Sequence, residues 1–388
     1  MSVLPKFTAL CLLCCACGND KKFESHYAES DDSYVIDISK MHRMDNFREA
    51  IAEIEFIPLE TNERSLIAEI DKVVFHKDRF YVLDKRYASL NVYSKAGKYI
   101  QSIGKMGRGP GEFSTLMDFM LDPEDESLLL LSNNEQAVFV YDLEGNHLQT
   151  IRNGLYANAI GKIGTDYYYF INHNDNELSQ KNNLIVMNRL GKVLDRLFPF
   201  PEAFKKTLGY SGFIFNNSEG LLYSSPLSDT IFQLTNNSEI YPKYMFDFGK
   251  STLPMAMRNS SDEYSKGASA YAVLHKQVVE TENTLAFTYA YERSIITAFC
   301  HRKRSHASEE SKILEPFRLG FPLSYEVVGT AGKDHFITSI SVDFVTWIEQ
   351  GHMSGEALER DYPSLYNLMP ELAPTDNPIL VVYKLQLQ

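Results

Sequence analysis

A stretch of this chain occurs twice, with a constant offset in residue number between the two copies. Each copy has an apolar run, a second apolar run that ends in Tyr, and a turn that contains Gly. The matching pairs are Leu83 and Leu131, Tyr93 and Tyr141, and Gly97 and Gly145. Periods of about 20–50 residues are typical of solenoids and β-propellers, in which each repeat forms one small structural unit. The repeat therefore constrains the architecture strongly and the function very little.

Each copy of the repeat is built from short apolar runs. In the first copy they are Ile70–Phe75, Arg79–Leu83, Leu90–Tyr93 and Tyr99–Ile103. Runs of this length, bounded by Asp, Lys, Ser or Gly, are typical of β-strands and are too short for helices. Four antiparallel strands per repeat make one blade of a β-propeller.

Looser copies of the pattern continue to the end of the chain. They begin near Tyr167, Gly220, Thr284 and His335. The count is then six, so the sequence predicts an all-β fold, a six-bladed β-propeller over residues 33–388. An N-terminal strand, either Ser33–Ile38 or Ile54–Leu59, is well placed to complete the last blade, because closing the ring removes an exposed sheet edge.

Two segments interrupt the last two units with a different pattern. Residues from about 253 to 282 and from about 347 to 372 carry apolar side chains at roughly helical spacing. Leu274 and Val278 illustrate the first segment, and Leu358 and Leu365 illustrate the second. We expect both segments to be helical insertions whose apolar stripes pack on the ring.

Residues 1–17 carry the pattern of an export signal. Lys6 precedes a short apolar run that ends at Cys17, and the small residue Ala16 comes just before that cysteine. The run is too short to span a bilayer. The pattern resembles a bacterial lipoprotein signal, which makes Cys17 the lipidated first residue of the mature protein and residues 18–32 a polar tether. The alternative is an apolar start that is rich in cysteine by chance.

The glycine-rich segment Gly104–Phe113 joins the first two repeats. Together with the preceding strand Tyr99–Ile103, it resembles the links of NHL-type repeats. The phrase Ile57–Thr61 is similar to the opening of six-bladed β-propeller lipoproteins of Bacteroidota. The resemblance covers about residues 33 to 388. It implies an exported module, lipid-anchored to the outer membrane, that binds a ligand or a protein.

The side of the outer membrane stays open at this stage. An acidic residue soon after the lipidated cysteine favours display at the cell surface in the lipoproteins that this chain resembles, and Asp20 fits that rule. Lys21 and Lys22 stand directly beside it and weaken the argument. We therefore expect either the periplasmic or the cell-surface side.

Charge and motifs exclude several classes of function. A net charge of −13 is the opposite of what a nucleic-acid-binding protein needs. The one basic run, His301–Arg304, is short, and we interpret it as a solvated hairpin tip. The chain has no zinc-binding His-Glu-x-x-His helix, Walker loop, nucleophile elbow or EF-hand loop, so we predict no cofactor, no metal and no catalytic residue. An enzyme, namely a hydrolase or lyase with a metal in the channel, is the alternative, because one fold can host many activities.

Two segments rich in oxygen atoms fall in predicted turns. Asp122–Glu126 begins with Asp-Pro, a common start of a turn, and His173–Glu177 lacks the alternating spacing of a Ca²⁺ loop. We interpret both segments as solvated connections between strands rather than as cation sites.

The predicted ligand site lies at one mouth of the central channel, where loops of several blades meet. Arg86 and Tyr87 follow the first apolar strand of the repeat, and Arg108 lies at the tip of the glycine-rich link. Our hypothesis is that these three side chains recognise an anionic or glycan-like ligand. The alternative is that they only connect strands. The expected partner is an unknown protein or glycan, with the membrane contacted only through the lipid anchor.

Overall fold

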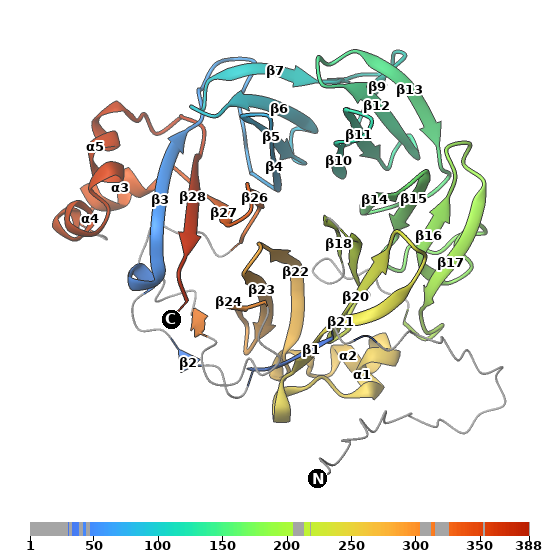
Figure 1. Ribbon diagram of the computed structural model, residues 1–388. Helices are drawn as coiled ribbons and strands as arrows, with labels where there is room; N and C mark the ends of the chain where they lie inside the picture. Colours follow the sequence, from blue (N-terminus) through green and yellow to red (C-terminus); the bar gives the residue numbers. More distant parts are fainter. Residues whose placement is uncertain are drawn as a thin grey trace, which may run out of the picture.

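The computed structural model describes residues 30, 33–38, 42–43, 47–204, 213–217, 219–302, 312–314, 326–351 and 354–387. Within these residues, six sheets of four or five strands are arranged around a central axis, as predicted (Figure 1). Each sheet is one blade, and its first strand lies nearest the axis. The predicted signal, residues 1–17 with Cys17, and most of the tether lie outside the described residues.

The first three blades follow the chain in order. Blade 1 contains β4 (Lys72–His76), β5 (Arg79–Asp84), β6 (Ser89–Ser94) and β7 (Tyr99–Ile103). Blade 2 contains β10 (Asp118–Asp122), β11 (Ser127–Ser132), β12 (Ala137–Asp142) and β13 (His147–Arg152). Blade 3 contains β14 (Ala159–Ile163), β15 (Asp166–Phe170), β16 (Asn182–Met187) and β17 (Val193–Pro199). A two-stranded ribbon, β8 (Lys105–Met106) and β9 (Glu112–Phe113), links blades 1 and 2.

The other three blades combine distant parts of the chain. Blade 4 contains β18 (Phe213–Asn217), β19 (Gly220–Ser224), β20 (Thr230–Thr235), β21 (Ile240–Asp247) and β1 (Tyr34–Asp37). Blade 5 contains β22 (Val273–Glu280), β23 (Thr284–Tyr291), β24 (Ser294–His301), β25 (Lys312–Leu314) and β2 (His42–Arg43). Blade 6 contains β26 (Gly329–Ala331), β27 (His335–Ile340), β28 (Ile379–Leu385) and β3 (Ile51–Pro58).

The ring closes in blade 6. There β3, from the N-terminal part, runs antiparallel to β28, from the C-terminal part, with Ile57 opposite Leu380 (Figure 1). Of the two predicted closing strands, the one over Ile54–Leu59 is therefore correct. The segment Ser33–Ile38 goes elsewhere: β1 lies parallel to β21 at the outer edge of blade 4.

The repeated residues form the contacts between blades. Leu83 packs toward blade 2 and its counterpart Leu131 packs toward blade 3, whereas Tyr93 and Tyr141 each pack toward the preceding blade. Successive side chains of a strand point to opposite faces of the sheet. Both faces of a blade are covered by its neighbours, which explains why the β11 strand is a continuous apolar run rather than an alternating one.

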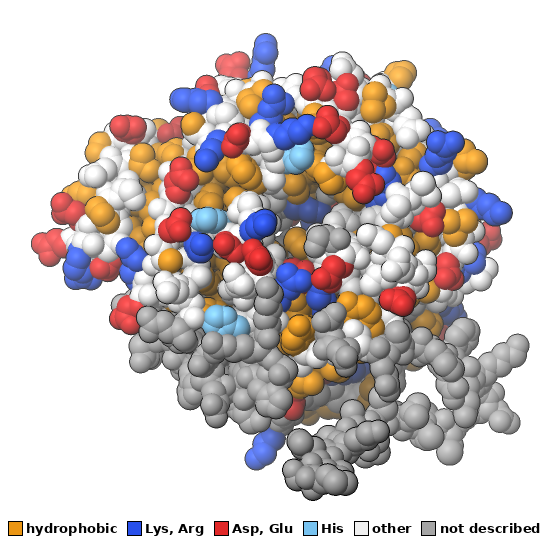
Figure 2. Space-filling view, in the orientation of Figure 1, with side chains coloured by type: hydrophobic (Ala, Val, Ile, Leu, Met, Phe, Trp, Pro, Cys, Tyr) orange, Lys and Arg blue, Asp and Glu red, His pale blue; other side chains and the backbone are white. Residues whose placement is uncertain are grey.

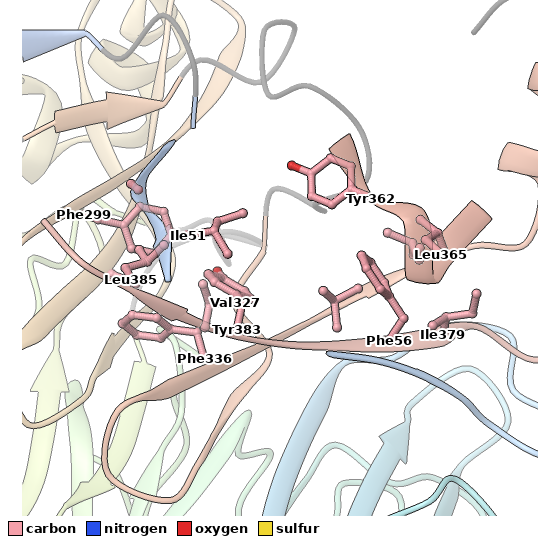
Figure 3. Close-up of a cluster of buried hydrophobic side chains, with 14 of the residues drawn as sticks. Ile51, Phe56, Phe299, Val327, Phe336, Tyr362, Leu365, Ile379, Tyr383 and Leu385 are labelled. Atoms are coloured by element: carbon pink, nitrogen blue, oxygen red, sulfur yellow. The ribbon is translucent and has the colours of Figure 1, made fainter. Parts of the chain in front are cut away.

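The second helical insertion lies between β27 and β28. It comprises the short helices α3 (Phe344–Glu349), α4 (Gly355–Asp361), α5 (Pro363–Leu368) and η5 (Met369–Glu371). These helices pack on blade 6, where Tyr362 and Leu365 face Phe56 and Ile379 of the sheet (Figure 3). The rings of Phe56 and Tyr362 meet edge to face at 6.1 Å.

The first insertion is shorter than predicted. Between blades 4 and 5 the chain forms η3 (Gly249–Ser251), α1 (Met255–Asn259), α2 (Ser261–Ser265) and η4 (Ala268–Ala270), and another short helix, η2 (Phe47–Ala50), precedes β3. The prediction of helix is wrong for Val273–Glu280, which is the innermost strand of blade 5. Leu274 and Val278 both bury into one cluster, and their spacing of four residues fits a strand as well as a helix.

No helix among the described residues is long and apolar enough to cross a membrane.

The repeat offers a matched test of ring closure. Gly97 and Gly145 occupy equivalent turns with φ of +78° and +88°. A Cβ atom at position 97 would lie 2.1 Å from the carbonyl oxygen of Pro58 in the closing strand, whereas at position 145 the nearest atom is a side-chain carbon of Ile103 at 3.4 Å.

We predict that Gly97→Ala lowers the free energy of unfolding more than Gly145→Ala does. The second change carries only the cost of a left-handed backbone, about 1–2 kcal/mol. The first must also displace the closing strand. Urea denaturation of both variants measures the difference, and equal losses would contradict the role of Gly97 at the closure.

Candidate functional site

A cavity of about 690 Å³ lies at the centre of the ring. Its wall includes residues of the first strand of every blade, and Figure 2 shows a recess near the centre of the face in view. The residues around this cavity differ in chemistry from one sector of the ring to the next.

Blades 1 and 2 supply most of the charged groups in the wall. The charged and titratable lining residues are Asp71, Lys72, His76, Lys85, Asp118, Asp122, Glu124 and, from blade 3, Lys162. The lining lysines form ion pairs with lining aspartates. Lys85 Nζ lies 3.7 Å from Asp71 Oδ1, and Lys72 Nζ lies 2.8 Å from Asp118 Oδ1.

Asp118 joins three blades at the start of β10. It accepts from Lys72 of blade 1 through Oδ1, and its Oδ2 accepts from the backbone N–H of Ile160 in blade 3 at 3.0 Å. Lys72 also donates to the carbonyl of Phe119 at 2.7 Å. Because Asp118 is almost fully buried, these hydrogen bonds offset the cost of removing its carboxylate from water.

Lys162 forms a second set of ion pairs at the other end of β10. It contacts Asp122, whose side chain is 5% exposed, and Asp125 at 2.7 Å. Burial alone would lower the pKa of Lys162, but hydrogen bonds to Asp122 and Asp125 outweigh burial and raise it. The hydrogen bond from Lys162 in turn lowers the pKa of Asp125. Lys162 therefore keeps its charge to a higher pH and Asp125 keeps its charge to a lower pH, and the two carboxylates of the cluster outnumber its one ammonium group.

Blades 3 and 4 supply amide side chains to the wall. The lining asparagines are Asn158, Asn172, Asn216, Asn217 and Asn236. Asn217 is engaged, since its Nδ2 donates to Gln233 and to Glu280, each at 2.9 Å. By contrast, the buried Oδ1 of Asn216 has no hydrogen-bond partner within the described part of the chain.

Blades 5 and 6 close the cavity with a mainly apolar wall. Val278, Val279 and Val328 line it together with Gly329 and Thr330. The Gly329 backbone lies against blade 1, and a Cβ there would be 2.0 Å from the carbonyl oxygen of Val73. Only glycine allows this approach of the first strands of blades 6 and 1.

His76 lies at the end of β4, on the wall of the cavity. Burial and the neighbouring Lys77 lower its pKa below the usual value, so the imidazole is neutral at pH 7. Its Nε2 atom is buried and has no hydrogen-bond partner among the described residues. A neutral imidazole offers one donor and one acceptor.

The predicted ligand residues lie on a single face of the ring. Arg86 and Tyr87 are in the turn between β5 and β6, and Arg108 is in the link between blades 1 and 2. Since the strands are antiparallel, that turn and that link are at the same end of blade 1. All three side chains are exposed, and none is part of the cavity wall, although the adjacent Lys85 is. Binding by these residues stays a prediction.

The sequence analysis missed most of the cavity residues. Lys72 and Asp118 could have been found, because each occupies the first position of an innermost strand just before an apolar run. Asp122 was assigned to a solvated turn. It does start the turn, accepting from the N–H of Glu124 at 3.0 Å, but it is buried and paired with Lys162.

Two other interpretations can be compared with the structure. In the loop after β15, Asp175 accepts hydrogen bonds from the hydroxyl of Ser179 and the N–H of Lys181, each at 2.7 Å, so its carboxylate stabilises the conformation of that loop.

The interpretation of the basic run as a solvated hairpin tip is wrong for Arg302. Its Nε lies 3.4 Å from Oε2 of the buried Glu280. No group of three or more potential metal ligands occurs within the residues that the structure describes.

We predict that Lys162→Met lowers the free energy of unfolding by about 3 kcal/mol, because it leaves the buried Asp122 carboxylate without its cation. Lys77→Met is the matched control: its pair with Glu126 is exposed to solvent, so the loss should be much smaller. Chemical denaturation measures both values, and similar losses would show that the buried cluster contributes no more than a surface pair.

The effect of Lys162→Met should depend on pH. The pKa of Asp125 is lowered in the folded protein, so its contribution is present at neutral pH and is lost as the pH falls through that lowered value. The difference in stability between the wild type and Lys162→Met should therefore narrow in acid. A difference that grows below about pH 4 would contradict the assignment.

Comparison with solved structures supports the fold. A candidate exported protein of Bacteroides fragilis aligns with a TM-score of 0.78 at 18% identity, covering 91% of this chain and 99% of that chain. A member of the DUF4221 family from Bacteroides vulgatus aligns with a TM-score of 0.54 at 11% identity, covering 87% and 97%. At such identities the likeness shows the fold alone.

No curated protein sequence matches this chain. A family model described as a domain of unknown function, DUF4934, matches residues 33–384, which is most of the chain. The chain therefore belongs to the DUF4934 family.

Proposed function

We propose that this protein is an exported lipoprotein with NHL-like blades that binds a ligand in its central cavity, and that Cys17 anchors it to the outer membrane. The observation that carries the binding role is the cavity of about 690 Å³, whose wall includes residues from all six blades. Ligand pockets in proteins typically have about 300–1,000 Å³ and combine apolar walls with a few convergent polar groups.

The arrangement of polar groups supports binding rather than a purely structural channel. Packing alone would fill the centre of the ring with apolar side chains, because protein interiors tolerate few voids. Here the lining residues instead include charged residues of blades 1 and 2 and asparagines of blades 3 and 4. A wall of this composition offers hydrogen-bonding groups to a ligand.

The exposed side chains of Arg86, Tyr87 and Arg108, which the sequence analysis assigned to ligand binding, would form the rim of the cavity in this proposal. Lys85 lines the cavity and is followed directly by Arg86 and Tyr87. Arg108 lies at the same end of blade 1. In this proposal the three side chains contact the part of a ligand that extends out of the cavity.

The proposals of export and of a lipid anchor rest on the N-terminal sequence and on a structural neighbour, not on the cavity. Residues 1–17 have the order of charge, apolar run and small residue before a cysteine that typifies lipoprotein signals. The structural neighbour from B. fragilis is itself described as a candidate exported protein. The tether that follows Cys17, residues 18–32, would let the propeller stand away from the membrane, on either its periplasmic or its cell-surface side.

A cavity-filling variant tests the binding role without knowledge of the ligand. Ala159 lines the cavity, whereas Ala96 is exposed in the turn between β6 and β7. We expect Ala159→Trp to lose a small molecule that co-purifies with the native protein from membranes, as detected by mass spectrometry, and Ala96→Trp to retain it. If both variants retain it, the ligand does not occupy the cavity.

The anchor is tested by metabolic labelling with a fatty-acid analogue and membrane fractionation. Cys17→Ser should abolish labelling and release the protein from the membrane fraction. Cys15→Ser, two positions earlier, should leave both unchanged. Labelling that survives Cys17→Ser would disprove the anchor while leaving the cavity proposal intact.

A further inference from the structure

Blade 6 differs from the first two blades in the connection between its second and third strands. In blades 1 and 2 this connection is a turn formed by residues 85–88 and 133–136, whereas in blade 6 residues 341–378 take its place. A short turn would be enough there, because Ile340 at the end of β27 pairs directly with Ile379 at the start of β28. Connections between elements are usually short, and they often carry the binding residues of a protein.

This insertion is held firmly on the ring. Its inner side buries Tyr362 and Leu365 against the sheet of blade 6 (Figure 3). Near its C-terminal end, Nδ2 of the buried Asn377 donates to the carbonyl oxygen of Glu60 at 3.0 Å and to that of Ser65 at 2.7 Å. The helices α3, α4 and α5 therefore form a fixed projection beside β3, at the edge of the ring (Figure 1).

The outer side of the insertion carries an excess of carboxylates. Its described part, residues 341–351 and 354–378, contains seven acidic residues and one arginine or lysine, Arg360. Arg360 is already paired with the adjacent Asp361 at 2.8 Å. Five exposed carboxylates have no ion-pair partner within the described residues, namely Asp343, Glu349, Glu356, Glu359 and Glu371. Such an excess attracts cationic groups and repels anionic ones.

The same surface exposes Trp347, the only tryptophan of the chain. Its side chain is 51% exposed on α3, whereas Phe344 and Ile348 of that helix pack on blade 6. A single exposed apolar residue would be ordinary, but this one shares a short helix with the unpaired carboxylates of Asp343 and Glu349. Tryptophan is enriched among the residues that dominate protein interfaces, and its ring attracts Lys and Arg side chains.

We propose that the helical insertion of blade 6 is a docking surface for a basic segment of a protein partner. Trp347 is the apolar anchor, and the carboxylates around it select the charge of the partner. Charge argues against two other occupants, because an anionic membrane surface would repel the insertion and a second copy carries the same net charge of −13. This role is separate from ligand binding in the central cavity.

Site-specific photo-crosslinking of the full-length protein in its native cells tests the docking surface. A photoreactive amino acid at Gln350, exposed at the C-terminal end of α3, samples the surroundings of Trp347. The control position is Asn237, exposed in the turn between β20 and β21 of blade 4. We expect a cross-linked protein from position 350 only, and mass spectrometry should map the link to a segment of the partner that is rich in Lys and Arg.

Charge reversal separates this surface from the overall negative charge of the chain. Glu356→Lys combined with Glu359→Lys should reduce the cross-linking yield at least about tenfold. Glu144→Lys combined with Glu239→Lys is the control, because it changes the net charge equally at two exposed residues outside the insertion. The control should cross-link like the wild type.

The anchor is tested in the same way. Trp347→Ala should also lower the yield about tenfold, whereas Leu190→Ala removes an apolar side chain that is 83% exposed on blade 3 and should have no effect. All the substituted side chains are exposed, and circular dichroism and melting curves should show that every variant is folded.

A direct titration completes the test. A synthetic, tryptophan-free copy of the cross-linked segment should shift the emission of Trp347 in the purified protein to shorter wavelength, with an affinity that falls as salt rises. The docking proposal would be overturned by the absence of a cross-linked protein at position 350, by a link to lipid or to a second copy, or by an equal yield after charge reversal. Each of these results would leave the cavity proposal intact.

Discussion

The rest of the structure depends on the pairing of two strands from opposite ends of the propeller sequence. β3 adds the outermost strand to blade 6 through a register that runs from Ile51 opposite Leu385 to Pro58 opposite Ile379. This pairing turns a row of six blades into a ring. Without it the first and last blades would expose apolar faces, and the central cavity would have an open side.

Closure also sets the geometry at the axis. The N–H of Val73 in blade 1 donates to the carbonyl of Val328 in blade 6 at 2.8 Å, and Gly329 permits the two backbones to approach. Around the ring, Asp118 and Lys162 tie blades 1, 2 and 3 together, and Asn217 ties blade 4 to Glu280 of blade 5. The same polar residues thus hold the innermost strands in place and shape the cavity.

Much of the fold could be predicted from the sequence because the residues that recur in its repeat are buried. Leu83 and Tyr93 recur at a fixed spacing since each blade repeats the same contacts with its two neighbours. Val273–Glu280 escaped prediction because apolar residues four positions apart satisfy both a strand and a helix. The position of Ser33–Ile38 at blade 4 also escaped, because a parallel edge strand carries no turn that fixes its partner.

The candidate site was harder to predict, for a physical reason. A single charged residue at a strand end has the same sequence signature whether it faces water or a buried counter-ion. Asp122 and Lys162 belong to different blades, and only the ring brings them together. The sequence pattern identified the exposed residues Arg86, Tyr87 and Arg108 because they lie in loops. It did not identify Asn216, because the cavity that Asn216 lines is formed by residues from all six blades.

The most direct test of the central claim is a high-resolution structure of the protein purified from its native membranes without added ligand. The account predicts continuous density for a small molecule within the cavity, in contact with residues of several blades. A cavity that holds only ordered water, with the co-purified molecule bound elsewhere on the ring, would contradict it.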